Sequence, residues 1–258
     1  ADDDDVREEL ADLYGSVVDA GVHPVSAIEV AETAKCIENV QRDINIALVN
    51  ELARVADGIG LDTREILDAA GTKWNFHDYR PGLVGGHCIP VDPFYFAHGA
   101  ERAGGDASLT LQAREVNEAM PDHVADLTLK ALNESGKVLN QSDVLLLGLA
   151  YKPDVADVRT SAAGEVAAAL EEYGVTVRGH DPHADPASLR DAFDFALDDG
   201  PDVNGVDAIV VATGHEVFST IDLRETAERM GENPVLVDVP ALFDGERARD
   251  CGFAYRRL

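Results

Sequence analysis

The sequence has few cysteines and no long apolar run. Its three cysteines, Cys36, Cys88 and Cys251, cannot all pair and show no CxxC spacing, so neither a disulfide framework nor a zinc ribbon fits. The longest clean apolar stretch, Val144 to Ala150, is far shorter than the roughly 20 residues of a membrane-spanning helix. No basic and apolar signal segment opens the sequence. We therefore expect a cytoplasmic protein with no membrane partner.

Positive charge is also scarce. Five lysines and sixteen arginines stand against 49 acidic residues, which gives a formal net charge of −28. A field this negative repels nucleic-acid phosphates, so we expect no nucleic-acid partner. The acidic excess is typical of halophilic cytoplasmic proteins, in which salt screens the self-repulsion. The 258 residues are 45% hydrophobic, which is enough for two compact units.

The first half of the sequence has helical periodicity. From Ile28 the apolar residues recur at steps of three and four until Gly58 and Gly60, which predicts one long helix. A helix of about 30 residues is some 45 Å long and needs a large partner surface, so we expect a homodimer through it. Shorter helices are predicted over residues 6–20, 63–71, 94–103 and 109–134, the last with a kink or restart at Pro121.

The second half changes period after Gly136. Short buried strands are predicted over residues 144–149, 175–178, 208–212 and 235–239, with helices over 161–173 and 223–230 among them. Strands that alternate with helices predict a parallel, doubly wound sheet. The expected fold class is therefore α/β, with an all-helical domain before a Rossmann-like domain.

A loop dense in Gly, Pro, His and aromatic residues joins two of the predicted helices. Its segment GGHCIPVDP, from Gly85 to Pro93, has two glycines that admit close backbone approach just before Cys88. Cys88 is therefore a candidate nucleophile, although an inert buried cysteine is the ordinary alternative. His87 could activate the thiol, but adjacent side chains in an extended loop commonly point apart.

Two further groups of polar residues could serve a reaction. Lys35 and Asn39 lie one turn apart on the long helix, where both can donate to a developing oxyanion, although solvated surface residues remain an alternative. The segment GLAYKPDVADVRTS, from Gly148 to Ser161, follows a predicted strand and leads into a helix. Ligands of open α/β sheets bind at that edge, and Lys152 and Arg159 supply the nearby cations.

Neither a standard dinucleotide site nor a metal site is expected from the residues themselves. The sequence has no GxGxxG, and Asp181 lies farther than about 20 residues beyond Gly148. His180, His183 and Asp185 look like a metal cluster, but a strand end followed by a turn is the preferred interpretation. We therefore predict no metal.

Four segments, in this order, resemble one family. They are AETAKCIENVQRDINIALVNELA (31–53), TKWNFHDYRPGLVGGHCIPVDPFYF (72–96), AREVNEAMP (113–121) and GLAYKPDVADVRTS (148–161). Together they resemble the nucleotide-sugar 6-dehydrogenases of the UDP-glucose/GDP-mannose dehydrogenase group. The histidine before Cys88 is similar to the UDP-N-acetylhexosamine branch, which acts on UDP-GlcNAc, UDP-GalNAc or UDP-ManNAc for surface polysaccharides. The UDP-glucose branch usually has another residue at position 87 and a lysine near Val91.

The resemblance implies a two-step oxidation of the sugar C6 alcohol to a carboxylate, with two NAD+ and with thiohemiacetal and thioester intermediates. Cys88 matches the nucleophile of the family. Lys35 and Asn39 match the pair that stabilises the C6 oxygen, and Asp92 matches the carboxylate that helps to position the hydrolytic water.

The resemblance also implies binding residues. Tyr151 and Lys152 match the loop that holds the UDP moiety, and Arg159 matches an arginine that reaches toward the cofactor. By position, three residues belong to the sugar-facing loop: Asn75, Arg80 and Gly85.

The family's N-terminal NAD-binding Rossmann domain has no counterpart in the sequence. The expected domains are a remnant of it (1–25), a central helical dimerisation domain with the cysteine loop (26–134) and a C-terminal UDP-sugar-binding domain (135–258). The main NAD site is thus expected outside this chain, which should bind better than it catalyses. The alternatives are a non-catalytic dimerisation and UDP-sugar-binding module, a UDP-glucose 6-dehydrogenase as the parent enzyme, and an unrelated thiol hydrolase.

Overall fold

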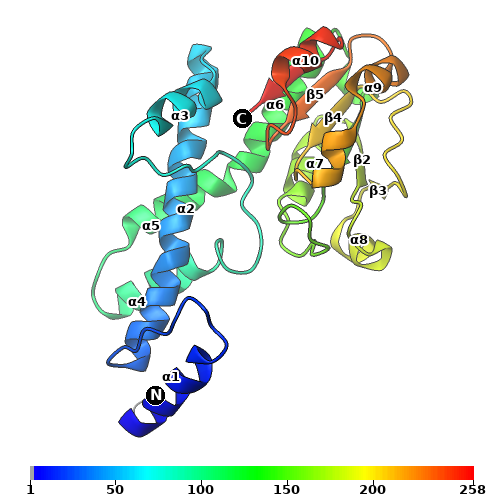
Figure 1. The fold of residues 1–258 in the computed structure, drawn as a ribbon. Helices are drawn as coiled ribbons and strands as arrows, with labels where there is room; N and C mark the ends of the chain where they lie inside the picture. The colour runs from blue at the N-terminus through cyan, green and yellow to red at the C-terminus, as the bar shows by residue number, and fades with distance from the viewer. Residues whose placement is uncertain (1–2) are drawn as a thin grey trace.

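The computed structural model describes residues 3–258, in which a helical part precedes an α/β part (Figure 1). Ala1 and Asp2, with which the predicted N-terminal remnant begins, lie outside the described residues. The helices before the sheet are α1 (Asp4–Gly15), α2 (Ile28–Ile59), α3 (Thr63–Gly71), α4 (Asp92–Arg102), α5 (Ser108–Glu118) and α6 (Met120–Glu134).

The long helix is confirmed as α2, which runs the length of the helical part (Figure 1). It ends at Gly60, whose φ of 72° is left-handed, and the N–H of Leu61 closes the end on the carbonyl of Ala56. Its apolar stripe is divided between two environments. Val40 is buried beneath the neighbouring helices, whereas Leu48 and Ile59 are each 65% exposed.

Local signals set the ends of the shorter helices. The carboxylate of Asp62 caps α3 by accepting hydrogen bonds from the N–H groups of Arg64 (2.9 Å) and Glu65 (3.0 Å), as its position in the sequence predicts. The segment 109–134 is two helices that meet at Ala119, so Pro121 lies in the first turn of a new helix. The first helix begins at Asp4, before the predicted start at residue 6, because Asp3 caps it. It is nevertheless shorter than the predicted 6–20, because it ends at Gly15.

The α/β part contains a single six-stranded, wholly parallel sheet with the strand order β3-β2-β1-β4-β5-β6. Its elements are η1 (Leu139–Gln141), β1 (Asp143–Leu147), α7 (Ala163–Glu171), β2 (Thr176–His180), α8 (Pro186–Ala192), β3 (Ala196–Leu197), β4 (Ala208–Val211), η2 (Glu216–Thr220), α9 (Leu223–Met230), β5 (Val235–Asp238), α10 (Gly245–Asp250) and β6 (Ala254–Arg257). The predicted doubly wound fold is confirmed. The sequence did not reveal β3 and β6, because β3 has two residues and β6 reads AYRR without an apolar run.

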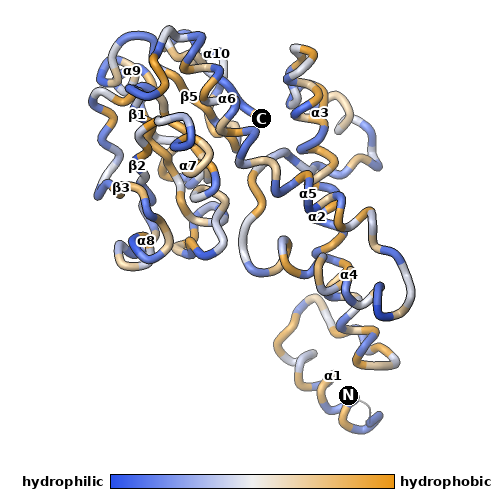
Figure 2. Tube along the Cα trace, turned by 180° about the vertical axis from the view of Figure 1, so that it is seen from behind, coloured by the Kyte–Doolittle hydropathy of each residue, from blue (hydrophilic) through white to orange (hydrophobic). Residues whose placement is uncertain are grey.

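The sheet has a hydrophobic core on each face. Val144 and Leu146 of β1 face a cluster with α6 and α7, whereas Leu145 and Leu147 face a cluster with α9 and α10. Figure 2 shows the hydrophobic strands between these two layers of helices. Helix α6 therefore belongs to the core of the sheet, although the predicted domain boundary at residue 134 places it with the helices before it.

The first strand ends two residues before its predicted end at Leu149. Gly148 has a φ of +82°, and a Cβ at this position would lie 2.2 Å from the carbonyl oxygen of Thr213. The chain therefore turns out of the sheet here, and a residue other than glycine could not make that turn without displacing the backbone after β4.

Two polar contacts join the start of α3 to the α/β part. Arg257 of β6 donates to Asp62 at 2.6 Å, and the guanidinium of Arg64 donates to the carbonyl of Pro240. Within the described range, no helix combines the length and the apolar character needed to cross a membrane.

Candidate functional site

A cavity of about 230 Å³ lies where the loop after α3 meets the carboxyl edge of the sheet. Three strand ends contribute to its wall, those of β1, β4 and β5, together with the start of α7. The lining residues are Pro81–Leu83, Gly85, Ala150–Pro153, Ser161–Ala163, Ala212–Gly214, Val239 and Pro240. Since strand order reverses between β1 and β4, the cavity occupies the switch point where ligands of open α/β sheets bind.

The predicted polar group of the long helix forms a cluster with the start of α4. Asn39 donates to Oδ2 of Asp92 at 2.5 Å, and Nζ of Lys35 lies 3.4 Å from the same oxygen. Asn39 is buried, whereas the side chains of Lys35 and Asp92 are 62% and 22% exposed. The structure thus brings the cation and the amide of one helical turn together with a carboxylate more than 50 residues away in the sequence.

Cys88 lies one turn before this cluster and is exposed. Its carbonyl oxygen accepts hydrogen bonds from the N–H groups of Val91 (3.1 Å) and Asp92 (2.9 Å), so the cysteine loop leads directly into α4. Cys36, the neighbour of Lys35, differs from Cys88. Its thiol donates to the carbonyl of Asp92, and burial raises its pKa, as does the nearby Asp92 carboxylate. Cys36 is therefore held as a protonated, structural thiol.

The two glycines before Cys88 pack against the segment after β1. A Cβ on Gly85 would lie 2.7 Å from the carbonyl oxygen of Thr160 and 3.1 Å from Cβ of Tyr151. The N–H of Gly86 donates to the same Thr160 oxygen at 3.4 Å. The close backbone approach that the glycine pair predicted therefore occurs, and it joins the cysteine loop to the wall of the cavity.

Asn50 of α2 holds the other end of this loop. Its side chain accepts from the N–H of Gly82 (2.8 Å) and donates to the Gly82 carbonyl (3.1 Å) and to Oδ1 of Asn117 (2.9 Å). Asn50 is fully buried, and Asn117 in turn donates to the buried carboxylate of Asp43. A polar network inside the helical part therefore fixes a cavity-lining residue, a role that nothing in the sequence indicated.

The predicted binding residues fall into two groups. Gly85, Tyr151 and Lys152 line the cavity. Asn75 is exposed on the preceding loop, and the Arg80 side chain pairs with Asp68 and Asp78 instead.

Arg159 also lies outside the lining of this cavity. It is 73% exposed and forms a bidentate pair with Asp157 at 2.8–2.9 Å. The hydrogen bonds from Arg159 hold the pKa of Asp157 well below its usual value. The structure therefore gives this arginine a neighbouring carboxylate as its partner.

The three residues of HDPHADP that look like a metal cluster, His180, His183 and Asp185, do not converge. His180 ends β2 and its Nδ1 lies 3.1 Å from the carbonyl oxygen of Asp198, whereas Asp185 caps α8. The strand end and turn expected from the sequence are confirmed. Sequence analysis missed Thr213, Gly214 and His215, which follow β4 at the same edge of the sheet. The rule that ligands bind at the carboxyl ends of strands could have identified them.

A sheet ordered 3-2-1-4-5-6 with a cavity at its switch point defines the Rossmann-like class of α/β proteins. The family follows from comparison with known proteins. Residues 29–119 match the central domain, and residues 145–245 match the UDP binding domain, of the UDP-glucose/GDP-mannose dehydrogenase family. The chain belongs to this family, which confirms the resemblance.

Three similar proteins show how much of a relative the chain covers. Protein CapL of Staphylococcus aureus is 43% identical over 214 residues, which cover 83% of this chain and 50% of that protein. UDP-N-acetyl-D-glucosamine 6-dehydrogenase of Pseudomonas aeruginosa is 37% identical over 245 residues, 95% of this chain and 58% of that protein. NDP-N-acetyl-D-galactosaminuronic acid dehydrogenase of Methanosarcina mazei Go1 superposes with a TM-score of 0.88 at 27% identity, over 100% of this chain and 56% of its own. The chain thus spans about half the length of these relatives.

Proposed function

We propose that this chain is the central and UDP-sugar-binding part of an NAD-dependent nucleotide-sugar 6-dehydrogenase that oxidises C6 of a UDP-N-acetylhexosamine to the uronic acid. The observation that carries the proposal is the cluster of Lys35, Asn39 and Asp92 one turn after an exposed cysteine. The same cysteine loop packs by its glycines against the cavity at the switch point.

In the proposed reaction, the Cys88 thiolate adds to the carbon of the C6 aldehyde to give a thiohemiacetal. Lys35 and Asn39 donate to the oxygen that gains negative charge in this addition. Oxidation of the thiohemiacetal gives a thioester. Water then attacks the thioester carbonyl, the C–S bond breaks, and the products are the carboxylate and the free thiol. Asp92 helps to position that water.

NAD+ is the proposed acceptor of both pairs of electrons, and we propose that its main site lies outside the described residues. The sequence contains no GxGxxG, and Arg159, the one proposed contact, is already paired with Asp157. We therefore place the main NAD site in the remaining part of the complete protein and derive no step at the nicotinamide. The proposal further includes a homodimer through α2 and a cytoplasmic location.

Replacement of Cys88 in the complete protein tests the proposal. Cys88→Ser is expected to lower carboxylate formation by several orders of magnitude, because a hydroxyl is not ionised near neutral pH and forms no thioester. Mass spectrometry of the product from the UDP-sugar and NAD+ measures the loss. Cys251→Ser, in the α/β part just after α10, is the control with normal turnover. Near-normal acid formation by Cys88→Ser would overturn the assignment of the nucleophile.

A further inference from the structure

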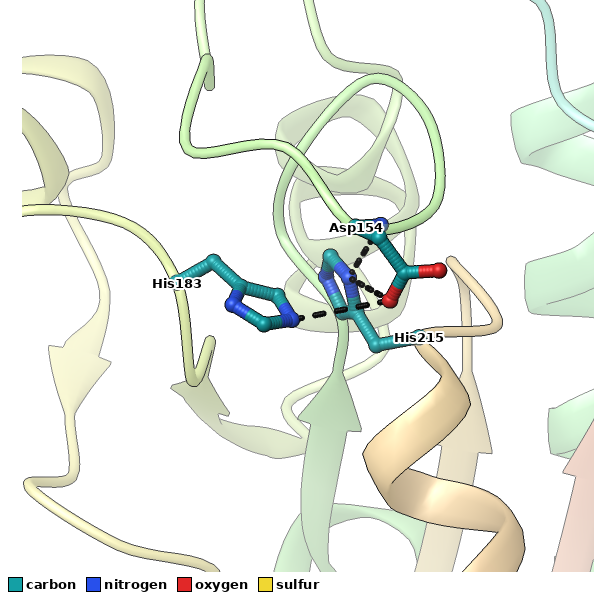
Figure 3. A group of neighbouring side chains, drawn as sticks. All are labelled: Asp154, His183 and His215. Atoms are coloured by element: carbon teal, nitrogen blue, oxygen red, sulfur yellow. Dashed lines mark hydrogen bonds and ion pairs between the residues drawn. The ribbon is translucent and has the colours of Figure 1, made fainter.

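A second polar cluster lies at the same edge of the sheet and has no part in the reaction above. It consists of Asp154, after β1, His183, after β2, and His215, after β4 (Figure 3). Nε2 of His183 lies 3.6 Å from Oδ1 of Asp154, and Nδ1 of His215 lies 3.8 Å from it. Two histidines and a carboxylate are metal-ligand types, so their actual hydrogen bonds decide what the cluster does.

These hydrogen bonds engage the nitrogen of His215 that a metal would need. Nδ1 of His215 accepts from the backbone N–H of Asp154 at 2.9 Å, and Oδ1 of Asp154 accepts from the N–H of Glu216 at 2.9 Å. The ligand atoms are also spread over as much as 4.8 Å, whereas two nitrogens on one zinc ion lie about 3.3 Å apart. A metal would have to displace the turn that His215 holds.

The partners of His215 define its tautomer. Because a backbone N–H can only donate, Nδ1 is unprotonated, and the ring proton is on Nε2. Nε2 lies 2.9 Å from Oδ2 of Asp181, to which it donates, and both side chains are completely buried. His215 therefore transmits the position of Asp181 to the backbone of Asp154.

Asp181 is itself fixed by the backbone. Oδ2 accepts from the N–H groups of Leu149 (2.7 Å) and Ala150 (2.8 Å), and Oδ1 accepts from those of His183 and Ala184. Burial alone raises the pKa of Asp181, but the hydrogen bonds from His215 and from these N–H groups outweigh it and hold the pKa well below its usual value. The carboxylate is thus an ionised, rigid acceptor.

The turn between Ala150 and Asp154 is consequently tied at both ends. The N–H of Ala150 is held by Asp181, and that of Asp154 by His215, with Asp154 in a left-handed conformation at φ +57°. Tyr151 is held separately, since its N–H donates to the carbonyl of Asp157. Lys152 lies between these restraints and lines the cavity.

We propose that His215 is a positioning residue for the UDP site, because its imidazole connects the buried Asp181 to the N–H of Asp154 and so fixes the turn that carries Lys152. This inference rests on the proposed function, in which the cavity binds UDP. His215 does not line the cavity, so it acts through the turn and not by contact with the ligand.

Isothermal titration of the 258-residue chain with UDP, in molar KCl, tests the proposal. His215→Phe removes both hydrogen bonds, and the bond to the Asp154 N–H is the one that fixes the turn. Loss of that one bond is expected to weaken UDP binding about tenfold. His215→Asn keeps an oxygen acceptor near the position of Nδ1 and is expected to restore binding to within about threefold of wild type. His180→Phe is the matched control, because His180 is also buried at a strand end but contacts Asp198, and its UDP affinity is expected to be unchanged.

Two measurements on the wild-type chain remain informative if His215→Phe does not fold. Imidazole 15N chemical shifts are expected to show His215 with its proton on Nε2, and the Asp154 amide is expected to exchange slowly. An Nδ1–H tautomer, or Zn²⁺ binding that His183→Ala abolishes, would overturn the inference.

The two proposals fail in different ways. Equal UDP affinity of folded His215→Phe and wild type would refute the positioning role alone. A wild-type chain that binds no UDP would refute the proposed UDP site, and the positioning role with it.

Discussion

Replacement of Asn50 by alanine is expected to loosen the cysteine loop from inside the helical part. The Asn50 side chain makes three hydrogen bonds, two to the backbone of Gly82 at 2.8 and 3.1 Å and one to Oδ1 of Asn117 at 2.9 Å. Asn50 is completely buried and Asn117 is 2% exposed, so water cannot replace the lost donor at Asn117 without a rearrangement. Gly82, which lines the cavity, is half-buried and can regain water.

The magnitude follows from these environments. A buried acceptor left without a donor costs about 1–3 kcal/mol, and each of the two hydrogen bonds to Gly82 contributes about 0.5–1.5 kcal/mol. Alanine is the better helix former by roughly 0.6 kcal/mol, which offsets part of the loss. We therefore expect Asn50→Ala to lower the free energy of unfolding by about 2–4 kcal/mol, and the Tm by roughly 10 °C for a chain of this size.

Urea denaturation followed by circular dichroism measures the free energy, and hydrogen exchange of the Gly82 amide reports the loop directly. Asn45→Ala is the matched control, because Asn45 lies on the same helix and donates only to the Gln41 carbonyl of that helix. It carries the same gain in helix propensity without the contact to Gly82. A loss below about 1 kcal/mol for Asn50→Ala, or unchanged exchange at Gly82, would refute the reasoning.

Three further outcomes are expected. Sedimentation in high salt is expected to show that the wild-type chain is a dimer at micromolar concentration. Leu48→Asp, on the exposed face of α2, is expected to give a monomer, because burial of a leucine side chain in the dimer contributes about 1.5–3 kcal/mol. A monomeric wild type would refute the dimer. UDP is expected to raise the Tm of this chain, because the cavity that would bind it is present, and NAD+ is expected to leave the Tm almost unchanged, because the sequence has no GxGxxG. Equal shifts with both ligands would contradict the assignment of the cavity. Asp181→Asn is expected to lose at least about 2 kcal/mol of stability between pH 5 and 8. The folded-state pKa of Asp181 is lowered, so the wild type loses this advantage as pH falls below about 4, and urea titrations whose difference grows toward acid would contradict it.

Much of the fold could be predicted because its signals are local. The apolar period of α2, the cap at Asp62 and the runs of β1, β4 and β5 each depend on residues a few positions apart. The elements that were missed lacked such a signal, as in the two-residue β3. Part of the candidate site could be predicted from local signals in the same way. Lys35 and Asn39 are one helical turn apart, so any helix places them on one face.

The sequence by itself determined the helical and parallel α/β organisation, the glycine-flanked cysteine and the family motifs, because each is encoded in a continuous segment. Only the tertiary structure decided which distant residues support the cavity. Asn50 contacts Gly82 across 32 residues, and His215 contacts Asp181 across 34. The physical reason is that the order of the parallel strands places the ends of β1, β2 and β4 side by side, and buried polar groups must then satisfy one another there.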